Sequence, residues 1–505
     1  MNQVAEAEAR EPVSLVRQLA DQAFSRAAGA LLIPGNSVHL LKDAQQNYPA
    51  WLQAIASARR TIHFENYIIR EDDTGRMFAD ALIAKAREGV RVRLIYDWMG
   101  NFGKTSRKFW NHLREGGIEV RCYNPPRLDS PLGWLSRDHR KMLAVDTQVA
   151  FVTGLCVGRE WVGEPEKNLD PWRDTGVEVR GPAVAEIERA FEQIWAMTDE
   201  PILETHSLGK ELATPAGDIA VRVVASRPNT AGMLRLDQLV ATLAHERLWL
   251  TDAYYAGTPS YVQALRAARH HGVDVRFLVP GVTDIPVLRP VSRAGYRPLL
   301  EAGVRIFEWN GSMLHAKTAV ADGRWARVGS TNLNLASWLG NCELDVVVED
   351  DEFGRRMEEM YLEDLTNATE VVLDAKHRVR APGAPTRARG AISSGTGSAG
   401  RATAGVFRIG NSVGAAMSDR RVLEPVETRI MTTAGLLLLG LAVLFALFPR
   451  LLAYPLIAII VWLAVALLYR GYDLKRESGR GVPHPAQITL QQAAEDAHEV
   501  EPKKE

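Results

Sequence analysis

Two short stretches of the chain share a pattern of histidine, lysine and aspartate that suits chemistry at phosphorus. Both read His-x-Lys-x-x-x-x-Asp, and the second copy lies 176 residues after the first at all three positions. One imidazole can attack a tetrahedral phosphorus, a second can protonate the leaving oxygen, and two ammonium groups can hold the non-bridging oxygens. This arrangement requires no metal ion and no cofactor. The copies are His139, Lys141 and Asp146, and His315, Lys317 and Asp322.

A single His-x-Lys would carry little information, but a duplicated eight-residue pattern is a strong signal. The residues after each lysine are apolar or small, which predicts that each motif lies on a buried strand. Residues two apart on a strand project from the same face, so each histidine should stand beside its lysine. Asp146 and Asp322 complete the catalytic motif. Their odd spacing from the histidines favours a role in holding backbone or a turn.

Polar residues that follow the motifs could complete the site. After the second motif, the hydroxyl of Ser330 and the carboxamide of Asn332 are candidates to bind phosphate oxygens. A carboxylate opens an apolar run in each half, Asp174 in the first and Glu343 in the second. We predict that each carboxylate accepts a hydrogen bond from Nδ1 of the histidine in its own half, which would fix the tautomer and orientation of the ring.

The motifs end two similar series of predicted elements. Helices and strands alternate from residue 51 in the first half and from residue 236 in the second, with matching words such as Gly89-Val-Arg-Val and Gly272-Val-Asp-Val. This order predicts two α/β domains related by a pseudo-two-fold axis. Because each half supplies one histidine and one lysine, the site should lie on that axis.

Other residues could shape the pocket. Glu65 and Asp252 stand in otherwise apolar strands, where they could form the pocket floor or hold a strand end. The loops over residues 125–137 and 281–293 are rich in apolar residues. They could cover the pocket and meet acyl chains, or they could be surface loops folded over their own side chains.

The two motifs, the turn Gly329-Ser-Thr-Asn332 and the pair Asn341-x-Glu343 resemble the phospholipase D superfamily, and specifically its cardiolipin synthase branch. The resemblance covers about residues 35–373. It implies two tandem phospholipase D-like domains, each a mixed sheet flanked by helices. It also implies transfer of a phosphatidyl group from one phospholipid to the head-group hydroxyl of another through a phosphatidyl-histidine intermediate.

The resemblance leans toward His139 as the nucleophile and His315 as the general acid. The sequence departs from the family pattern at Cys156, which takes in the first half the position of Asn332 in the second. A thiol is a poorer donor to phosphate than a carboxamide, so the first half-site could be the weaker electrophilic partner.

The implied partners are phospholipids, namely phosphatidylglycerol and, as a further candidate, phosphatidylethanolamine. A phospholipase D-type hydrolase, in which water takes the second step, is an alternative that the motifs do not separate from a transferase. A nucleic-acid-processing or nucleic-acid-binding member of the superfamily is a third reading. The net charge of −1 gives no general attraction for nucleic acid, so no nucleic-acid partner is expected.

Composition divides the remaining chain. Two uncharged apolar runs, 433–448 and 451–468, are each near the roughly 17-residue lower limit for a spanning helix and predict a transmembrane hairpin. Basic residues flank both ends, which predicts the inner (cytoplasmic) membrane with the catalytic domains facing the cytoplasm. The expected parts are an N-terminal extension with an amphipathic helix (1–34), the two domains (35–210 and 211–375), a basic linker (376–430), the hairpin (431–470) and a polar tail (471–505).

Overall fold

A computed structural model of the chain describes residues 15–126, 135–167, 169–202, 214–285, 288–373 and 379–380, together with scattered residues between 436 and 472. Contacts divide the chain into two units. The first unit comprises residues 1–125 and 135–431 and contains both motifs, and the second comprises residues 126–134 and 432–505.

The first unit begins with α1 (Leu15–Ala28) and then builds two halves of similar element order. The first half contains β1 (Leu32–Lys42), α2 (Asp43–Ser57), β2 (Thr61–Asn66), α3 (Asp73–Arg87), β3 (Arg91–Asp97), α4 (Trp98–Asn101), α5 (Arg107–Glu115), β4 (Glu119–Tyr123), β5 (Lys141–Val145), β6 (Val149–Thr153), α6 (Arg159–Val162), β7 (Thr175–Arg180) and α7 (Ala183–Thr198). The second half contains β8 (Ile219–Ser226), α9 (Gly232–Leu243), β9 (Arg247–Thr251), α10 (Pro259–His270), β10 (Asp274–Pro280), α11 (Leu288–Glu301), β11 (Arg305–Trp309), β12 (Thr318–Ala321), β13 (Trp325–Gly329), β14 (Glu343–Glu349), α12 (Asp351–Leu365), β15 (Ala368–Leu373) and β16 (Val379–Arg380).

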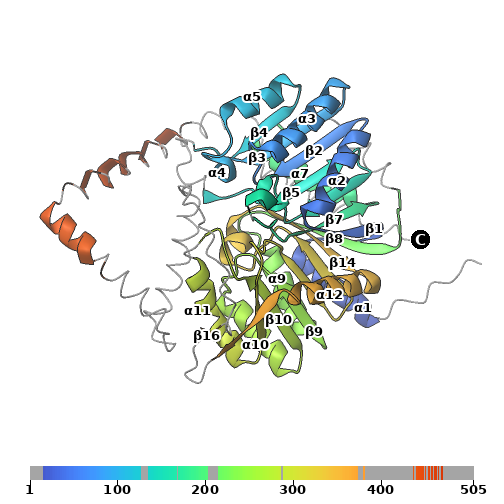
Figure 1. The fold of residues 1–505 in the computed structure, drawn as a ribbon, viewed down its shortest axis with the longest axis vertical. Coiled ribbons are helices and arrows are strands. Elements are labelled where there is room, and N and C mark those ends of the chain that lie inside the picture. The colour runs from blue at the N-terminus through green and yellow to red at the C-terminus, as the bar shows by residue number, and fades with distance from the viewer. Residues whose placement is uncertain are drawn as a thin grey trace, which may run out of the picture. The chain divides into compact units, whose positions relative to one another are not determined.

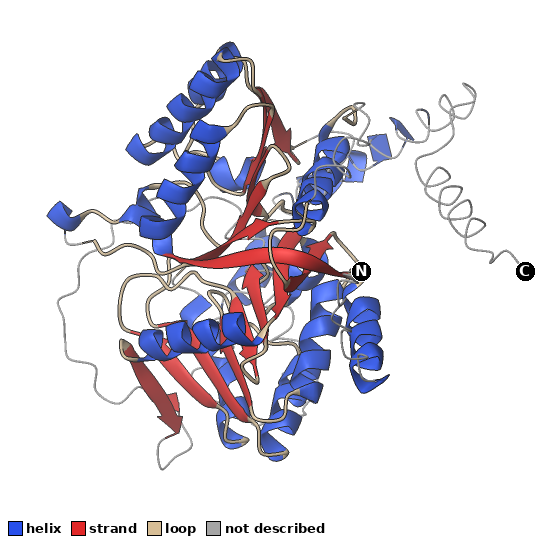
Figure 2. Cartoon of the chain, turned by 90° about the vertical axis from the view of Figure 1, so that its right-hand side faces the viewer, coloured by secondary structure: helices blue, strands red, loops and turns tan. Residues whose placement is uncertain are grey.

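The described strands form one mixed sheet whose order repeats on either side of its centre (Figure 1). In each half, three parallel strands are followed by three antiparallel ones, in the orders β4-β3-β2-β5-β6-β7 and β11-β10-β9-β12-β13-β14. At the centre, β1 and β8 pair antiparallel and so join β7 to β14. Helices flank the strands, as Figure 2 shows. The predicted duplication of a mixed sheet flanked by helices is confirmed, and the two halves share a single sheet.

Three clusters of buried apolar side chains stabilise the unit. One lies within the first half and includes Trp51 and Phe78, and another lies within the second half and includes Leu265 and Phe277. The third cluster draws on both halves, with Val177 of β7 and Val346 of β14 among its members. Burial of apolar surface is the main favourable contribution to folding, so this shared cluster holds the halves in a fixed relation.

Local signals set several helix ends. The side chains of Asp72, Ser106 and Asp350 each accept a hydrogen bond from a backbone N–H in the first turn of α3, α5 and α12. Several predicted boundaries differ from the structure. The helix expected from residue 236 begins at Gly232 as α9. The helix expected from residue 51 already begins at Asp43, and α11 begins at Leu288, inside the loop predicted over residues 281–293.

The predicted N-terminal amphipathic helix is α1, and it packs against α9. Its polar face is fixed by the buried guanidinium of Arg222, which donates to Asp21 Oδ1 at 2.8 Å and to Ser25 Oγ at 2.6 Å. The helix therefore belongs to the packed unit.

The hairpin predicted over residues 431–470 falls on a stretch that is described only in part. Residues 439–447 are helical and carry exposed apolar side chains, including Leu439, Val443 and Leu447. Among the described residues, no helix is long and apolar enough to cross a membrane. Most of the predicted linker, the tail and the tip of the 125–137 loop lie outside the described residues.

Candidate active site

The two motifs occupy equivalent strand positions. His139 precedes β5, which pairs with β2 and β6, and His315 precedes β12, which pairs with β9 and β13. The side chains of both histidines and both lysines are buried. Each lysine Nζ donates to the backbone carbonyl of its own motif histidine. The ring of Tyr67 lies near the side chains of both His139 and Lys141, and the second motif shares Tyr254 in the same way, so histidine and lysine stand on one face as the spacing predicts.

Aromatic rings border each histidine. Tyr67 lies edge-on to His139 with 4.9 Å between ring centroids, and Tyr254 lies edge-on to His315 at 5.9 Å. His315 is also contacted by two tryptophans, Trp161 and Trp172, at 5.5 and 5.6 Å. The tryptophans come from the other half of the chain and gave no recognisable pattern in the sequence.

Backbone hydrogen bonds cross between the halves at the start of each motif. The His139 N–H donates to the Cys342 carbonyl at 2.9 Å, and the His315 N–H donates to the Arg173 carbonyl at 2.7 Å. Cys342 and Arg173 are the residues immediately before Glu343 and Asp174. Each motif histidine therefore lies beside the carboxylate of the opposite half.

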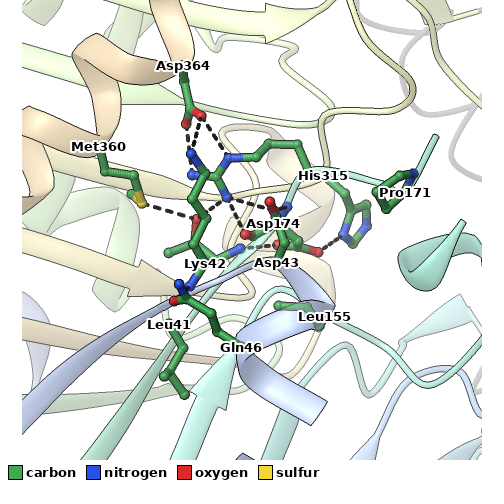
Figure 3. Close-up of polar contacts among 12 residues, drawn as sticks. Leu41, Lys42, Asp43, Gln46, Leu155, Pro171, Asp174, His315, Met360 and Asp364 are labelled. Atoms are coloured by element: carbon green, nitrogen blue, oxygen red, sulfur yellow. Dashed lines mark hydrogen bonds and ion pairs between the residues drawn. The ribbon is translucent and has the colours of Figure 1, made fainter. Parts of the chain in front are cut away.

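The histidine–carboxylate pairs are accordingly exchanged between the halves. His139 Nδ1 lies 2.9 Å from Glu343 Oε2, and His315 Nδ1 lies 2.7 Å from Asp174 Oδ2. The prediction that each carboxylate serves the histidine of its own half is wrong, because the crossing backbone bonds decide which ring each carboxylate can reach. Figure 3 shows the His315–Asp174 pair.

Different donors hold the two carboxylates. Ser330 Oγ donates to Glu343 Oε2 at 2.5 Å and itself accepts from the Leu344 N–H at 2.9 Å. Asn341 Nδ2 donates to the second oxygen of Glu343 at 3.3 Å. Ser330, predicted to bind phosphate, therefore positions the carboxylate that orients His139.

Asp174 receives hydrogen bonds on both oxygens. Trp161 Nε1 donates to Oδ2 at 2.9 Å, and the Thr175 N–H donates to Oδ1 at 2.9 Å. Gly154 takes the position equivalent to Ser330, and a Cβ there would lie 2.1 Å from Asp174 Oδ1. Only glycine leaves room for this carboxylate, so the indole of Trp161 replaces the serine hydroxyl as the side-chain donor.

The backbone around Asp174 is tied to both halves by Arg173. The buried Arg173 guanidinium lies 2.8 Å from Asp364 at the end of α12 and 3.1 Å from Asp43 at the start of α2. Figure 3 shows Asp43 beside Asp174, with Asp364 further away. Removing one partner of a buried ion pair leaves an uncompensated charge, so this link resists displacement of the halves.

Electrostatics keep the imidazoles neutral and the carboxylates charged. Burial lowers the pKa of His139, and burial together with Lys317 lowers the pKa of His315 to about 3. Burial alone would raise the pKa of Asp174 and of Glu343, but the neighbouring histidines and lysines outweigh it and leave both values lowered. An ionised carboxylate on Nδ1 selects the tautomer protonated there, which makes Nε2 the basic atom of each ring.

The motif aspartates perform a structural task. Asp146 accepts hydrogen bonds from the backbone N–H groups of Arg59, Arg60 and Thr61 at 2.7–2.8 Å. Asp322 does the same for residues 245–247 at 2.8–2.9 Å. Both aspartates lie at the far end of the motif strand from the histidines and hold the turn that leads into β2 or β9. The structural interpretation of their spacing is confirmed by these bonds, whereas a catalytic role for Asp146 and Asp322 stays a prediction.

Asn332 and Cys156 occupy equivalent positions and are both buried. Asn332 Oδ1 has no hydrogen-bond partner among the described residues. Burial raises the pKa of the Cys156 thiol, although the charges of Lys141 and Lys317 act in the opposite direction. Asp252, a candidate for the pocket floor, instead accepts from the Leu333 and Tyr254 N–H groups at 2.7 and 3.0 Å.

Glu65 behaves differently from Asp252. It is fully buried, and burial followed by the charge of Asp138 raises its pKa well above the usual range. Asp138, next to the motif histidine, has a pKa raised to about 7, mainly by burial. Glu65 lies on β2, opposite Met142 of the first motif strand, and forms a buried carboxyl pair with Asp138. No group of three or more described His, Cys, Asp or Glu side chains is arranged to hold a metal ion.

Comparison with known proteins shows to which family this chain belongs. The family described as "Cardiolipin synthase, PLD-like domain" matches residues 51–195 and 240–365, together more than half of the chain. The chain belongs to the cardiolipin synthase family of phospholipase D-like proteins. Each of the two matched segments of the chain contains one His-Lys pair.

Curated relatives carry the same name. The chain is 34% identical to a cardiolipin synthase of Alkalihalophilus pseudofirmus over 66% of this chain and 66% of that protein. It is 33% identical to cardiolipin synthase A of Pseudomonas aeruginosa strain LESB58 over 69% of this chain and 71% of that protein. The crystal structure of phosphatidylserine synthase from Haemophilus influenzae Rd KW20 shares the fold, with a TM-score of 0.54, 12% identity, and 70% and 91% of the two chains covered.

Proposed function

We propose that the protein is a cardiolipin synthase-type phosphatidyltransferase that works through a phosphatidyl-histidine intermediate. The observation that carries the proposal is the pair of buried imidazoles, each bonded through Nδ1 to a carboxylate and each accompanied by a buried lysine. This arrangement supplies a nucleophile, a proton donor and two fixed positive charges for a phosphodiester, in a chain whose relatives are named cardiolipin synthases.

In the first step, Nε2 of His139 attacks the phosphorus of phosphatidylglycerol. The N–P bond forms as the bond to the glycerol head group breaks, and His315 gives its Nε2 proton to the departing oxygen. Lys141 and Lys317 hold the non-bridging oxygens. The phosphate charge offsets the two ammonium groups that lower the pKa of His315, so substrate binding itself favours the protonated acid.

In the second step, the head-group hydroxyl of another phosphatidylglycerol attacks the phosphatidyl-histidine. His315 takes the proton of that hydroxyl, the N–P bond breaks, and cardiolipin is released with His139 restored. Glu343 stabilises the positive charge that His139 carries while it is bonded to phosphorus, and Asp174 does the same for protonated His315.

A phosphatidyltransferase must meet both lipids at a membrane, and we assign the anchor to residues 431–470. Two uncharged apolar runs and the exposed leucines of residues 439–447 support this assignment. Removing the chain after Val422 should leave folded protein that moves partly to the soluble fraction. A truncated protein that stays wholly membrane-bound in high salt would show that the anchor lies elsewhere.

The decisive test is lipid analysis. Expression in a cardiolipin-free bacterial host should restore cardiolipin, and purified protein with phosphatidylglycerol vesicles should release one glycerol for each cardiolipin. Vesicles that also contain phosphatidylethanolamine test the second donor by release of ethanolamine. Phosphatidic acid as the main product would instead show a hydrolase in which water takes the second step. The His139→Ala and His315→Ala variants are the inactive controls.

A further inference from the structure

The carboxamide of Asn66 is buried beside the first motif lysine. In the antiparallel pairing of β2 and β5, Asn66 lies directly opposite Lys141. Opposite residues of such a pair project from the same face with their Cβ atoms about 5 Å apart. The side chain of Asn66 therefore stands on the face of β2 that meets the lysine, although the residue is 0% exposed.

The orientation of the carboxamide follows from its one hydrogen bond. Asn66 Oδ1 accepts from the Ile68 N–H at 3.3 Å, so the oxygen faces the backbone. Asn66 Nδ2 is buried and has no hydrogen-bond partner among the residues that the structure describes. A buried amide donor without an acceptor is costly, which points to a ligand that supplies the missing oxygen.

The second half has a different residue at this place. The pairing of β12 with β9 matches Thr318 with Thr251, so Lys317 and Asp252 oppose each other one step further along. Asp252 accepts a hydrogen bond from the N–H of the residue two positions later, as Asn66 does. This shared bond confirms that Asp252 takes the position of Asn66 in the second half. Its other oxygen accepts from the Leu333 N–H, so this position offers no donor in the second half.

The position of Asn332 and Cys156 shows the opposite distribution. There the second half carries a carboxamide, and the first half carries a thiol, which is a poor donor. Of these two pairs of equivalent positions, each half therefore carries an asparagine at one, but the halves differ in which one. The first half has Asn66 with Cys156, and the second has Asp252 with Asn332.

We propose that Asn66 is a phosphate-binding residue, whose Nδ2 donates to a non-bridging oxygen of the phosphodiester held by Lys141 and thereby replaces the donor that Cys156 cannot supply. The proposal deepens the phosphatidyltransferase function and rests on it for the identity of the substrate. The chemistry it requires is only that of a tetrahedral oxyanion between the two lysines.

The test compares anion binding and turnover in matched variants. Asn66→Ala removes the donor, and Asn66→Asp keeps the acceptor for Ile68 while placing a carboxylate where phosphate should bind. Asn101→Ala is the structural control, because its carboxamide is buried but fully bonded to Ile69, Tyr67 and Asp97. Thermal melting establishes that each variant is folded, and inorganic vanadate serves as the probe of the phosphate site.

Asn66→Ala should lower kcat/KM by about 10²-fold, the usual effect of losing one oxyanion donor, and Asn66→Asp should lower it further. In both Asn66 variants vanadate should raise the melting temperature less and should inhibit turnover less strongly. Asn101→Ala should change only the melting temperature of the free protein. Asn66→Ala with Cys156→Asn should regain at least tenfold of the lost kcat/KM. Unchanged vanadate binding in folded Asn66→Ala, or no recovery in the double variant, would overturn the proposal. Vanadate binding is measured without lipid. A wild-type protein that makes no cardiolipin would therefore refute the proposed function, and vanadate binding would still decide whether Asn66 binds phosphate.

Discussion

The exchanged histidine–carboxylate pairs lead to a prediction that sequence alone would have reversed. Glu343→Gln removes the negative charge beside His139 with little change of shape. The amide oxygen can take the place of Oε2 and still accept from Ser330 and from His139 Nδ1. The amide nitrogen replaces the oxygen that accepts the 3.3 Å bond from Asn341, so the loss is one of charge and of this single long bond. The variant should therefore fold, but it should no longer stabilise His139 when that ring becomes cationic on bonding to phosphorus.

The expected loss can be bounded from related chemistry. Replacing the aspartate of a hydrolytic triad by asparagine lowers kcat about 10⁴-fold, and part of that loss comes from the wrong tautomer. Because Glu343→Gln can keep the tautomer, we expect a loss of about 10³–10⁴-fold, or roughly 4–5 kcal/mol of transition-state stabilisation. Asp174→Asn should disturb the local structure more, because Oδ1 of Asp174 accepts from the fixed backbone N–H of Thr175, whereas the second oxygen of Glu343 accepts only a longer bond from the Asn341 side chain.

The assay is formation of the covalent adduct from a phosphatidyl ester of p-nitrophenol, whose leaving group needs no proton. With His139 as nucleophile, His315→Ala should form the adduct and His139→Ala should not. Glu343→Gln should then match His139→Ala, and Asp174→Asn should match His315→Ala. The exchanged pairing is judged by which variants behave alike. This comparison therefore stays valid even if an adduct on His315 shows that the roles of the two histidines are reversed. Asp174→Asn behaving like His139→Ala, with Glu343→Gln behaving like His315→Ala, would refute the exchanged pairing.

Four further outcomes test the electrostatics and the scaffold. Burial lowers the pKa of Lys317 to about 8, so kcat/KM should decline above that pH as the lysine loses its charge, and Lys317→Arg, if active, should move the decline upward. The pKa of His315 is about 3 in the folded state and 6.5 ordinarily, so between these pH values the unfolded chain binds one proton more than the folded chain. The free energy of unfolding should therefore fall as the pH drops from 6.5 toward 3, and it should fall less steeply in His315→Ala. Asp146→Ala should lower the free energy of unfolding by about 1 kcal/mol, because three largely exposed N–H groups of the turn lose their carboxylate acceptor, while kcat per folded molecule is retained. A loss of kcat at native melting temperature would show that Asp146 has a catalytic role. Activity should survive EDTA, and a loss that a divalent ion restores would contradict the metal-free mechanism.

Much of the fold was predictable because its signals are local. Apolar runs, helix caps and glycine turns recur with the same order in both halves, which predicted the duplicated sheet and placed both motifs on buried strands. The odd spacing of Asp146 and Asp322 likewise predicted their structural task. The start of α11 was missed because its first residues follow a long irregular loop and include a proline.

The sequence by itself determined that each histidine stands beside the lysine of its motif, since the spacing of two residues on a strand is fixed by backbone geometry. It did not determine how the halves share the residues of the site. His139 reaches Glu343, and His315 reaches Asp174, because backbone bonds to Cys342 and Arg173 cross between segments far apart in the chain. Such pairing depends on how the two halves of the sheet meet at β1 and β8, and no local pattern records it. The donor roles of Ser330, Trp161 and Asn66 were decided in the same way, by neighbours that only the folded chain brings together.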